Sequence, residues 1–160
     1  MSSSDQIENY VNRFNNRKIC NRFLGVFSSD NLPDYFVKGC GLICNYDPLN
    51  KEGSHWCAIL WPINLEKIIW FDSFGLPPDY DDRILHDRTA FKAYIEKIAQ
   101  KNNIVTSFNT FDFQSLTTSV CGHYATFFIL YGLDNMEQFK SIRQPMRDKI
   151  IREAINFPSD

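Results

Sequence analysis

Cys121 opens the most apolar stretch of the chain. Residues 124–131 are apolar on every face, which predicts a helix buried on all sides. Since Cys121 comes just before that run, we expect its thiol on the first turn of the helix, where Ser119 or Thr118 would cap the free amides. The positive end of the helix dipole favours the thiolate, which is the nucleophilic form of cysteine. Gly122 beside it leaves room for a substrate backbone.

A nucleophilic cysteine needs a base, a group that orients the base, and donors for the oxyanion that forms on the attacked carbonyl. His55 begins one predicted strand and Asp72 ends the next. Two such positions at the same end of an antiparallel hairpin lie side by side. We therefore expect Asp72 to accept the N–H of His55 and to hold the ring toward Cys121.

The oxyanion donors are predicted from Gln114 and Cys121. Gln114 lies seven positions before Cys121, at the end of a strand-like segment, and could direct its side-chain amide at the oxyanion. The backbone N–H of Cys121 would be the second donor. His123 is a rival base, but two positions beyond Cys121 on a helix it faces away from the thiol.

Each of these residues also has an ordinary interpretation when taken alone. Cys121 could be a small packing residue at a helix end, and His55 a hydrogen-bonded histidine at a strand end. Asp72 could open a turn, and Gln114 could be an exposed polar residue. Trp56, which follows His55, could be a core tryptophan, as Trp61 and Trp70 are expected to be.

The elements that position these residues follow from the periodicity. Residues 55–61 and 67–72 are apolar on both faces and predict a central hairpin, with further strand-like segments at 23–27, 38–45 and 104–111. Helical spacing predicts helices at 5–16 and 84–101. Residues 136–157 predict two helical pieces separated near Pro145. Residues 46–53 predict a turn, and His86 is expected on the surface.

Composition places the chain among folded proteins. Its 160 residues predict a single domain over residues 1–160, with 44% apolar and 15% aromatic residues. The net charge of −2, without a long run of one sign, gives no support for a nucleic-acid or membrane-surface binder. The polar start shows no secretory signal, and the longest apolar run is too short to span a bilayer. The five cysteines, an odd count, predict free thiols in a reducing compartment. Cys40 and Cys44 are expected to pack rather than bind metal.

Together these motifs resemble the set found in the adenovirus-type cysteine endopeptidase (adenain) family of the Ulp/adenain clan. The order is His, acid, Gln, Cys, with 17 positions from His55 to Asp72 and seven from Gln114 to Cys121. The matching segments are Gly53-Ser54-His55-Trp56, Asp72-Ser73-Phe74-Gly75, Gln114-Ser115, Cys121-Gly122 and the early Phe23-Leu24-Gly25.

The resemblance implies an α+β fold, with a central mixed β-sheet packed between helices and the cysteine at the start of a buried helix. It implies that His55 is the base, Asp72 its orienter, Cys121 the nucleophile and Gln114 an oxyanion donor. Trp56 would help to wall a channel for glycine-rich substrate residues. The expected activity is endopeptidase cleavage of viral capsid or core precursor proteins after small glycine-containing motifs during virion maturation, through a thioester.

The chain also departs from the adenoviral pattern. Its acid is Asp72, followed by Ser73 as in SUMO-specific proteases, where adenoviral enzymes usually have Glu, and only 39 residues follow Cys121. Adenoviral enzymes use an activating peptide tethered through a cysteine shortly before the Gln, and DNA. Residues 101–113 hold no cysteine and the chain is not basic, so we expect any activating peptide to bind without a disulfide tether and find no support for activation by DNA.

The expected source is a virus or virus-like element of virophage, Polinton or adenovirus-like type. The expected state is a monomer without cofactor, metal or membrane contact. We expect it inside the infected host cell and packaged in the virion, not secreted. Two alternatives stay open: a SUMO- or ubiquitin-like deconjugating protease, and a catalytically silent peptide-binding module.

Overall fold

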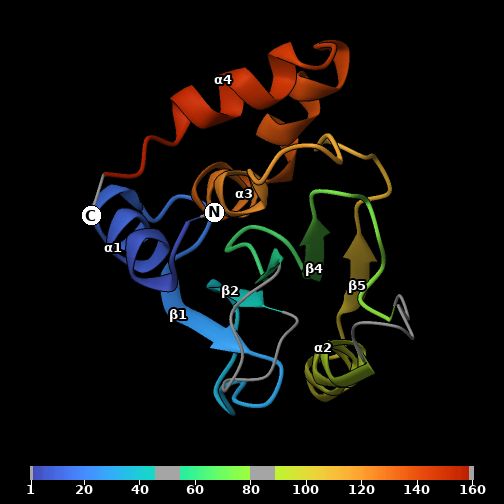
Figure 1. The fold of residues 1–160 in the computed structure, drawn as a ribbon. Coiled ribbons are helices and arrows are strands. Elements are labelled where there is room, and N and C mark those ends of the chain that lie inside the picture. Colours follow the sequence, from blue (N-terminus) through green and yellow to red (C-terminus); the bar gives the residue numbers. More distant parts are fainter. Residues whose placement is uncertain (1, 46–54, 80–88, 159–160) are drawn as a thin grey trace.

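Five strands form one sheet whose spatial order is the order of the chain (Figure 1). The structure is a computed structural model, and it describes residues 2–45, 55–79 and 89–158. The strands are β1 (Arg22–Ser28), β2 (Cys40–Asn45), β3 (Trp56–Leu60), β4 (Lys67–Asp72) and β5 (Val105–Phe108). The three central strands pair antiparallel, and the outer pairs β1–β2 and β4–β5 are parallel. The mixed sheet and the central β3–β4 hairpin are confirmed.

Helices cover both faces of this sheet (Figure 1). α1 (Ser4–Phe14) and α3 (Cys121–Glu137) pack on one face, and α2 (Thr89–Asn102) packs on the other. A short 3-10 helix, η1 (Gln138–Ser141), leads to α4 (Met146–Ala154), which packs against α3. The predicted α+β fold is therefore correct.

Both faces of the central strands are buried, which explains their unbroken apolar character. In β3, Ala58 and Leu60 join the core under α3, whereas Cys57 and Ile59 join the core under α2. This division follows from side chains that alternate along a strand. Trp61 and Trp70 are core residues, as predicted; both belong to the core under α2.

α3 begins at Cys121 and is buried along its first half, as predicted. The predicted cap is wrong, because the residue before the helix is Val120, which makes no side-chain capping bond. The Thr118 hydroxyl instead donates to the Asp148 carboxylate at 2.7 Å, so it is occupied away from the helix end. The helix bends at Gly132, whose φ of 80° is open to glycine and costly for other residues.

Several predicted boundaries shift or fall outside the described residues. The strand predicted at 104–111 is shorter, because β5 ends at Phe108. The predicted two helical pieces before and after Pro145 are confirmed as η1 and α4. The predicted turn at 46–53, the motif residues 53–54, the beginning of the helix predicted at 84–101, and His86 lie outside the described residues. Among the described helices, none combines the length and the apolar character that crossing a bilayer demands.

Candidate active site

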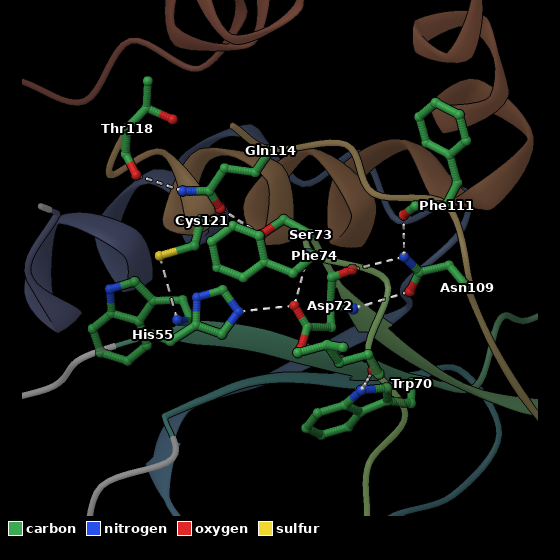
Figure 2. A network of polar contacts seen from close by, with 12 residues as sticks. His55, Trp70, Asp72, Ser73, Phe74, Asn109, Phe111, Gln114, Thr118 and Cys121 are labelled. Carbon is green, nitrogen blue, oxygen red and sulfur yellow. Dashed lines mark hydrogen bonds and ion pairs between the residues drawn. The ribbon is translucent and has the colours of Figure 1, made fainter. Parts of the chain in front are cut away.

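His55 and Asp72 meet at one end of the β3–β4 ladder. His55 lies one residue before β3, and Asp72 ends β4 opposite Cys57. The distance between His55 Nε2 and Asp72 Oδ1 is 2.8 Å, and both residues are buried (Figure 2). The backbone N–H of Phe74 donates to the same Oδ1 at 2.8 Å. The carboxylate is therefore fixed on two sides and can hold the imidazole in one orientation.

Cys121 places its sulfur on the other side of the imidazole (Figure 2). The backbone N–H of Trp56 donates to Cys121 Sγ at 3.5 Å, which joins the start of α3 to the start of β3. His55 hydrogen-bonds the same sulfur. The structure thus brings Cys121 to the His55–Asp72 pair, which lies far from it in the chain.

The pKa values of Cys121 and His55 are shifted in opposite directions, which favours transfer of the proton from the sulfur to the imidazole. Burial by itself would raise the pKa of the Cys121 thiol, but the hydrogen bond and charge of His55, together with the N–H groups of Trp56 and Gly122, lower it below its ordinary value. Burial would lower the pKa of His55, but the hydrogen bonds and charges of Asp72 and Cys121 raise it to about 9. Both shifts favour a thiolate beside an imidazolium over a neutral thiol and imidazole.

Two further residues hold this pair, and no role was predicted for either of them from the sequence. Phe74 stacks on the His55 ring, with centroids 4.9 Å apart and planes at 20°. Asn109 accepts from the backbone N–H of Asp72 at 3.0 Å and donates from Nδ2 to the Asp72 carbonyl at 2.7 Å. Its side chain extends the β4–β5 pairing beyond Phe108. No local pattern marks Asn109, because this role depends on the register between two parallel strands.

Gln114 is buried, only 3% exposed, in the loop between β5 and α3 and not at the end of a strand. Ser73 Oγ donates to Gln114 Oε1 at 2.6 Å, and Gln114 Nε2 donates to the Thr118 carbonyl at 2.9 Å. Figure 2 shows this side chain beside Cys121. Because a primary amide carries two N–H groups, one remains after the bond to Thr118. The arrangement can supply a fixed donor near the sulfur.

Trp56 lies against the residue that follows the cysteine. Its indole is buried, and Nε1 donates to the Ser2 carbonyl at 3.1 Å. A Cβ placed on Gly122 would lie 3.1 Å from Trp56 Cδ1 and 3.3 Å from Ile7 Cδ1. The space beside Gly122 is thus taken by side chains of this chain. The predicted role of Trp56 in a substrate channel stays a prediction.

His123 is not the base of this site, and Cys20 and Cys44 differ from Cys121 in the direction of their pKa shifts. His123 packs its ring on Phe157, at 4.7 Å between centroids, and burial with the positive charges of Arg152 and the N-terminus lowers its pKa to about 4. All five cysteines are free and buried. Burial raises the pKa of Cys20 to about 12 and that of Cys44 well above the ordinary value, in contrast to Cys121.

Within the described part of the chain, His55, Cys57 and Asp72 have ligand atoms within 4.8 Å of one another, the types that a zinc ion binds. Two of these groups already bond each other at 2.8 Å. A metal bound there would compete with proton transfer between Cys121 and His55.

A cysteine, a histidine and an aspartate joined in this way on an α+β scaffold define a cysteine-protease type of site. The chain belongs to the Ulp1 protease family, since residues 44–155 match the C-terminal catalytic domain of that family.

Two known proteins are similar to this chain. A protein of Acanthamoeba polyphaga mimivirus, named "Putative thiol protease R355", is 30% identical over 128 residues, which are 80% of this chain and 38% of that protein. The crystal structure of the Se-Met ASFV pS273R protease matches the fold with a TM-score of 0.52 at 23% identity, over 76% of this chain and 44% of that one. The chain spans less than half the length of either relative.

Proposed function

We propose that this chain is the catalytic domain of a cysteine endopeptidase in which Cys121 is the nucleophile. The thiolate attacks the carbonyl carbon of the scissile peptide, and the π electrons move to the carbonyl oxygen. The Gln114 amide and the Cys121 N–H stabilise that oxyanion. The His55 imidazolium gives its proton to the leaving amine as the thioester forms. His55 then takes a proton from water, which attacks the thioester carbonyl carbon, and the C–S bond breaks to release the acid product and restore the thiolate beside the imidazolium.

The observation that carries this proposal is the position of His55 between two partners. Its Nε2 lies 2.8 Å from Asp72 Oδ1, while the same ring bonds the Cys121 sulfur and lowers the pKa of that thiol. A packing cysteine would have a raised pKa, as Cys20 and Cys44 do. The alternative of a catalytically silent binding module gives no reason for this difference in pKa between Cys121 and those two cysteines.

The natural substrates in this proposal are viral capsid or core precursors, cut after small glycine-containing motifs during virion maturation. The mimivirus relative supports a viral source. The virophage, Polinton or adenovirus-like type proposed here rests on the adenain-type motif set alone. Trp56 would line the channel for the glycine residues. The enzyme would act as a monomer at the site of virion assembly and be packaged in the virion. Any activating peptide would bind without a disulfide.

A second candidate, a deconjugase for SUMO- or ubiquitin-like modifiers, has one specific observation in its favour. The pair Asp72-Ser73 is the form seen in SUMO-specific proteases, and Ser73 here orients Gln114 at 2.6 Å. This candidate differs from the first in substrate and not in chemistry.

Both candidates are tested with one panel of substrates. The panel holds capsid precursors, peptides with Gly-Gly before a fluorophore amide, and modifier–fluorophore conjugates. Cys121→Ala and His55→Ala should each reduce turnover by about 10⁴-fold or more. Iodoacetamide should label Cys121 ahead of the other four thiols. Equal labelling of all five thiols, or wild-type protein that cleaves nothing, would reject the protease and favour the binding module.

A further inference from the structure

Asp148, on α4, is a carboxylate that is 2% exposed and bonds the loop that carries Gln114. Its Oδ2 accepts from the Ser115 N–H at 3.1 Å and from Thr118 Oγ1 at 2.7 Å. Its Oδ1 accepts from the Tyr124 hydroxyl at 2.7 Å and from Gln144 Nε2 at 2.9 Å. A buried carboxylate is stable only with such donors, so its contacts are strongly directional.

The Oδ2 contacts fix Gln114 indirectly, through Ser115 and Thr118. Ser115 follows Gln114 directly, so its bond to Asp148 holds the backbone at Gln114. Thr118 is held through its hydroxyl, and its carbonyl accepts from Gln114 Nε2 at 2.9 Å. With Ser73 bonded to the other end of the amide, the direction of the remaining N–H is determined.

The Oδ1 contact ties the same carboxylate to the helix of the nucleophile. Tyr124 lies three residues after Cys121 on α3, and its hydroxyl is also 3.1 Å from the Phe113 carbonyl. Arg147, the neighbour of Asp148, donates from Nη1 to the carbonyls of Asp112 and Phe113 at 3.2 and 3.1 Å. α4 therefore sets the loop of Gln114 relative to the first turn of α3, where the Cys121 N–H lies.

We propose that Asp148 is a positioning residue for oxyanion stabilisation and that it controls acyl transfer without controlling formation of the thiolate. This inference rests on the proposed function, since it assigns Gln114 and the Cys121 N–H as the donors. Asp148 holds the distance between those two donors. The proton transfer between Cys121 and His55 depends on Asp72 and on the β3–β4 ladder instead.

Two reactions of the same sulfur separate these roles. Alkylation by iodoacetamide forms an S–C bond as iodide leaves, and no charge develops on a carbonyl oxygen. Addition to a peptide aldehyde forms an S–C bond as the carbonyl π pair moves to oxygen, which then takes the proton of His55. The second reaction uses the oxyanion donors and needs no turnover, whereas the first uses only the thiolate.

The variants are Asp148→Asn and Thr118→Val, with Thr118→Ser as the conservative change that keeps the hydroxyl. Ile98→Ala on α2 is the matched control, because Ile98 is buried in the core on the opposite face of the sheet. Thermal unfolding of each protein is measured first. Comparison is made with Ile98→Ala at a temperature where all are folded.

For Asp148→Asn we expect kcat on the Gly-Gly peptide amide to fall by about ten- to a hundredfold with KM changed little, below the loss for deleting a donor outright. Affinity for a peptide ending in Gly-glycinal, measured as protection of Cys121 from alkylation, should fall by a similar factor. The alkylation rate without aldehyde should stay within about twofold of wild type. Thr118→Val should move in the same direction, and Thr118→Ser should recover most of the loss.

Equal losses in alkylation and in aldehyde affinity for folded Asp148→Asn would overturn the inference, because Asp148 would then hold the whole site. Unchanged aldehyde affinity would overturn it as well, and so would wild-type protein that does not bind the aldehyde. Wild-type protein that binds the aldehyde but cleaves nothing on the panel would reject the proposed function. In that case the Asp148 comparison still decides the inference.

Discussion

The two sides of the Cys121 sulfur are built in different ways. On one side, His55 and Asp72 are held by a two-strand ladder between segments close in the chain. On the other, Gln114 sits in a loop whose shape depends on Ser73 and on Asp148, 33 residues beyond Ser115. The first side is rigid through backbone pairing, and the second through buried side-chain hydrogen bonds.

In the proposed mechanism, this difference separates the reactivity of the sulfur from catalysis. The side formed by His55 and Asp72, called the ladder side, controls whether the sulfur is a thiolate, because it shifts the pKa values of Cys121 and His55. In the proposed mechanism, the side formed by Gln114, Ser73 and Asp148, called the loop side, decides whether a carbonyl oxygen finds its donors. Substitutions on the ladder side should change the pH profile, and substitutions on the loop side should change rates at constant pH profile.

Asp72→Asn should have the largest effect, a fall in kcat/KM of about 10³- to 10⁴-fold, because the imidazole loses the carboxylate that orients it. In the proposed mechanism, wild-type activity requires the thiolate and the imidazolium. As the pH is raised, activity should appear at a pH below the ordinary pKa range of a thiol, because the pKa of Cys121 is lowered. Activity should be lost as the pH rises through about 9, where His55 loses its proton. Since Asp72 raises the pKa of His55, the upper limb should move to lower pH in the variant.

Asp79→Asn is the control, because Asp79 is an exposed carboxylate paired with Lys92. The measurement is kcat/KM as a function of pH for the three proteins. An upper limb that stays near pH 9 in Asp72→Asn would contradict the role of Asp72.

Gln114→Ala should lower kcat by about 10²- to 10³-fold, the usual loss for one oxyanion donor. Its pH profile and its rate of alkylation at Cys121 should match wild type, since the ladder side is untouched. Gln100→Ala on the exposed surface of α2 serves as the control for the amide itself. A shifted pH profile in Gln114→Ala would remove the distinction between the two sides.

Phe74→Ala should have the smallest effect and tests how far the ladder side extends. Its ring stacks on His55, and such aromatic pairs contribute about 0.5–1.5 kcal/mol, so kcat/KM should fall roughly two- to twelvefold. Phe108→Ala on β5, where the ring is partly exposed, controls for loss of an aromatic side chain. Equal changes in both variants would show that the stack on His55 has no special part.

Much of the ladder side could be predicted from the sequence. Two apolar runs joined by a short turn specify a hairpin, and a hairpin places His55 beside Asp72. The apolar run after Cys121 likewise specifies a buried helix with the cysteine at its start. In each case the pattern that determines the structure is local.

The loop side could not be predicted in the same way. The capping expected from Thr118 was wrong because its hydroxyl bonds Asp148, 30 positions away. The role of Asn109 in holding Asp72 depends on strand register. The position of the Gln114 side chain depends on contacts with Ser73 and Thr118. Side-chain hydrogen bonds between distant segments leave no periodic mark in a sequence.

The order of the strands has a consequence for synthesis. Each strand pairs with the one made just before it, so the sheet can grow in the direction in which the ribosome delivers the chain. α4 emerges after the nucleophile. A nascent chain would therefore acquire its reactive sulfur before Asp148 arrives to set the loop of Gln114. The order of translation itself would delay full proteolytic competence until α4 has been made.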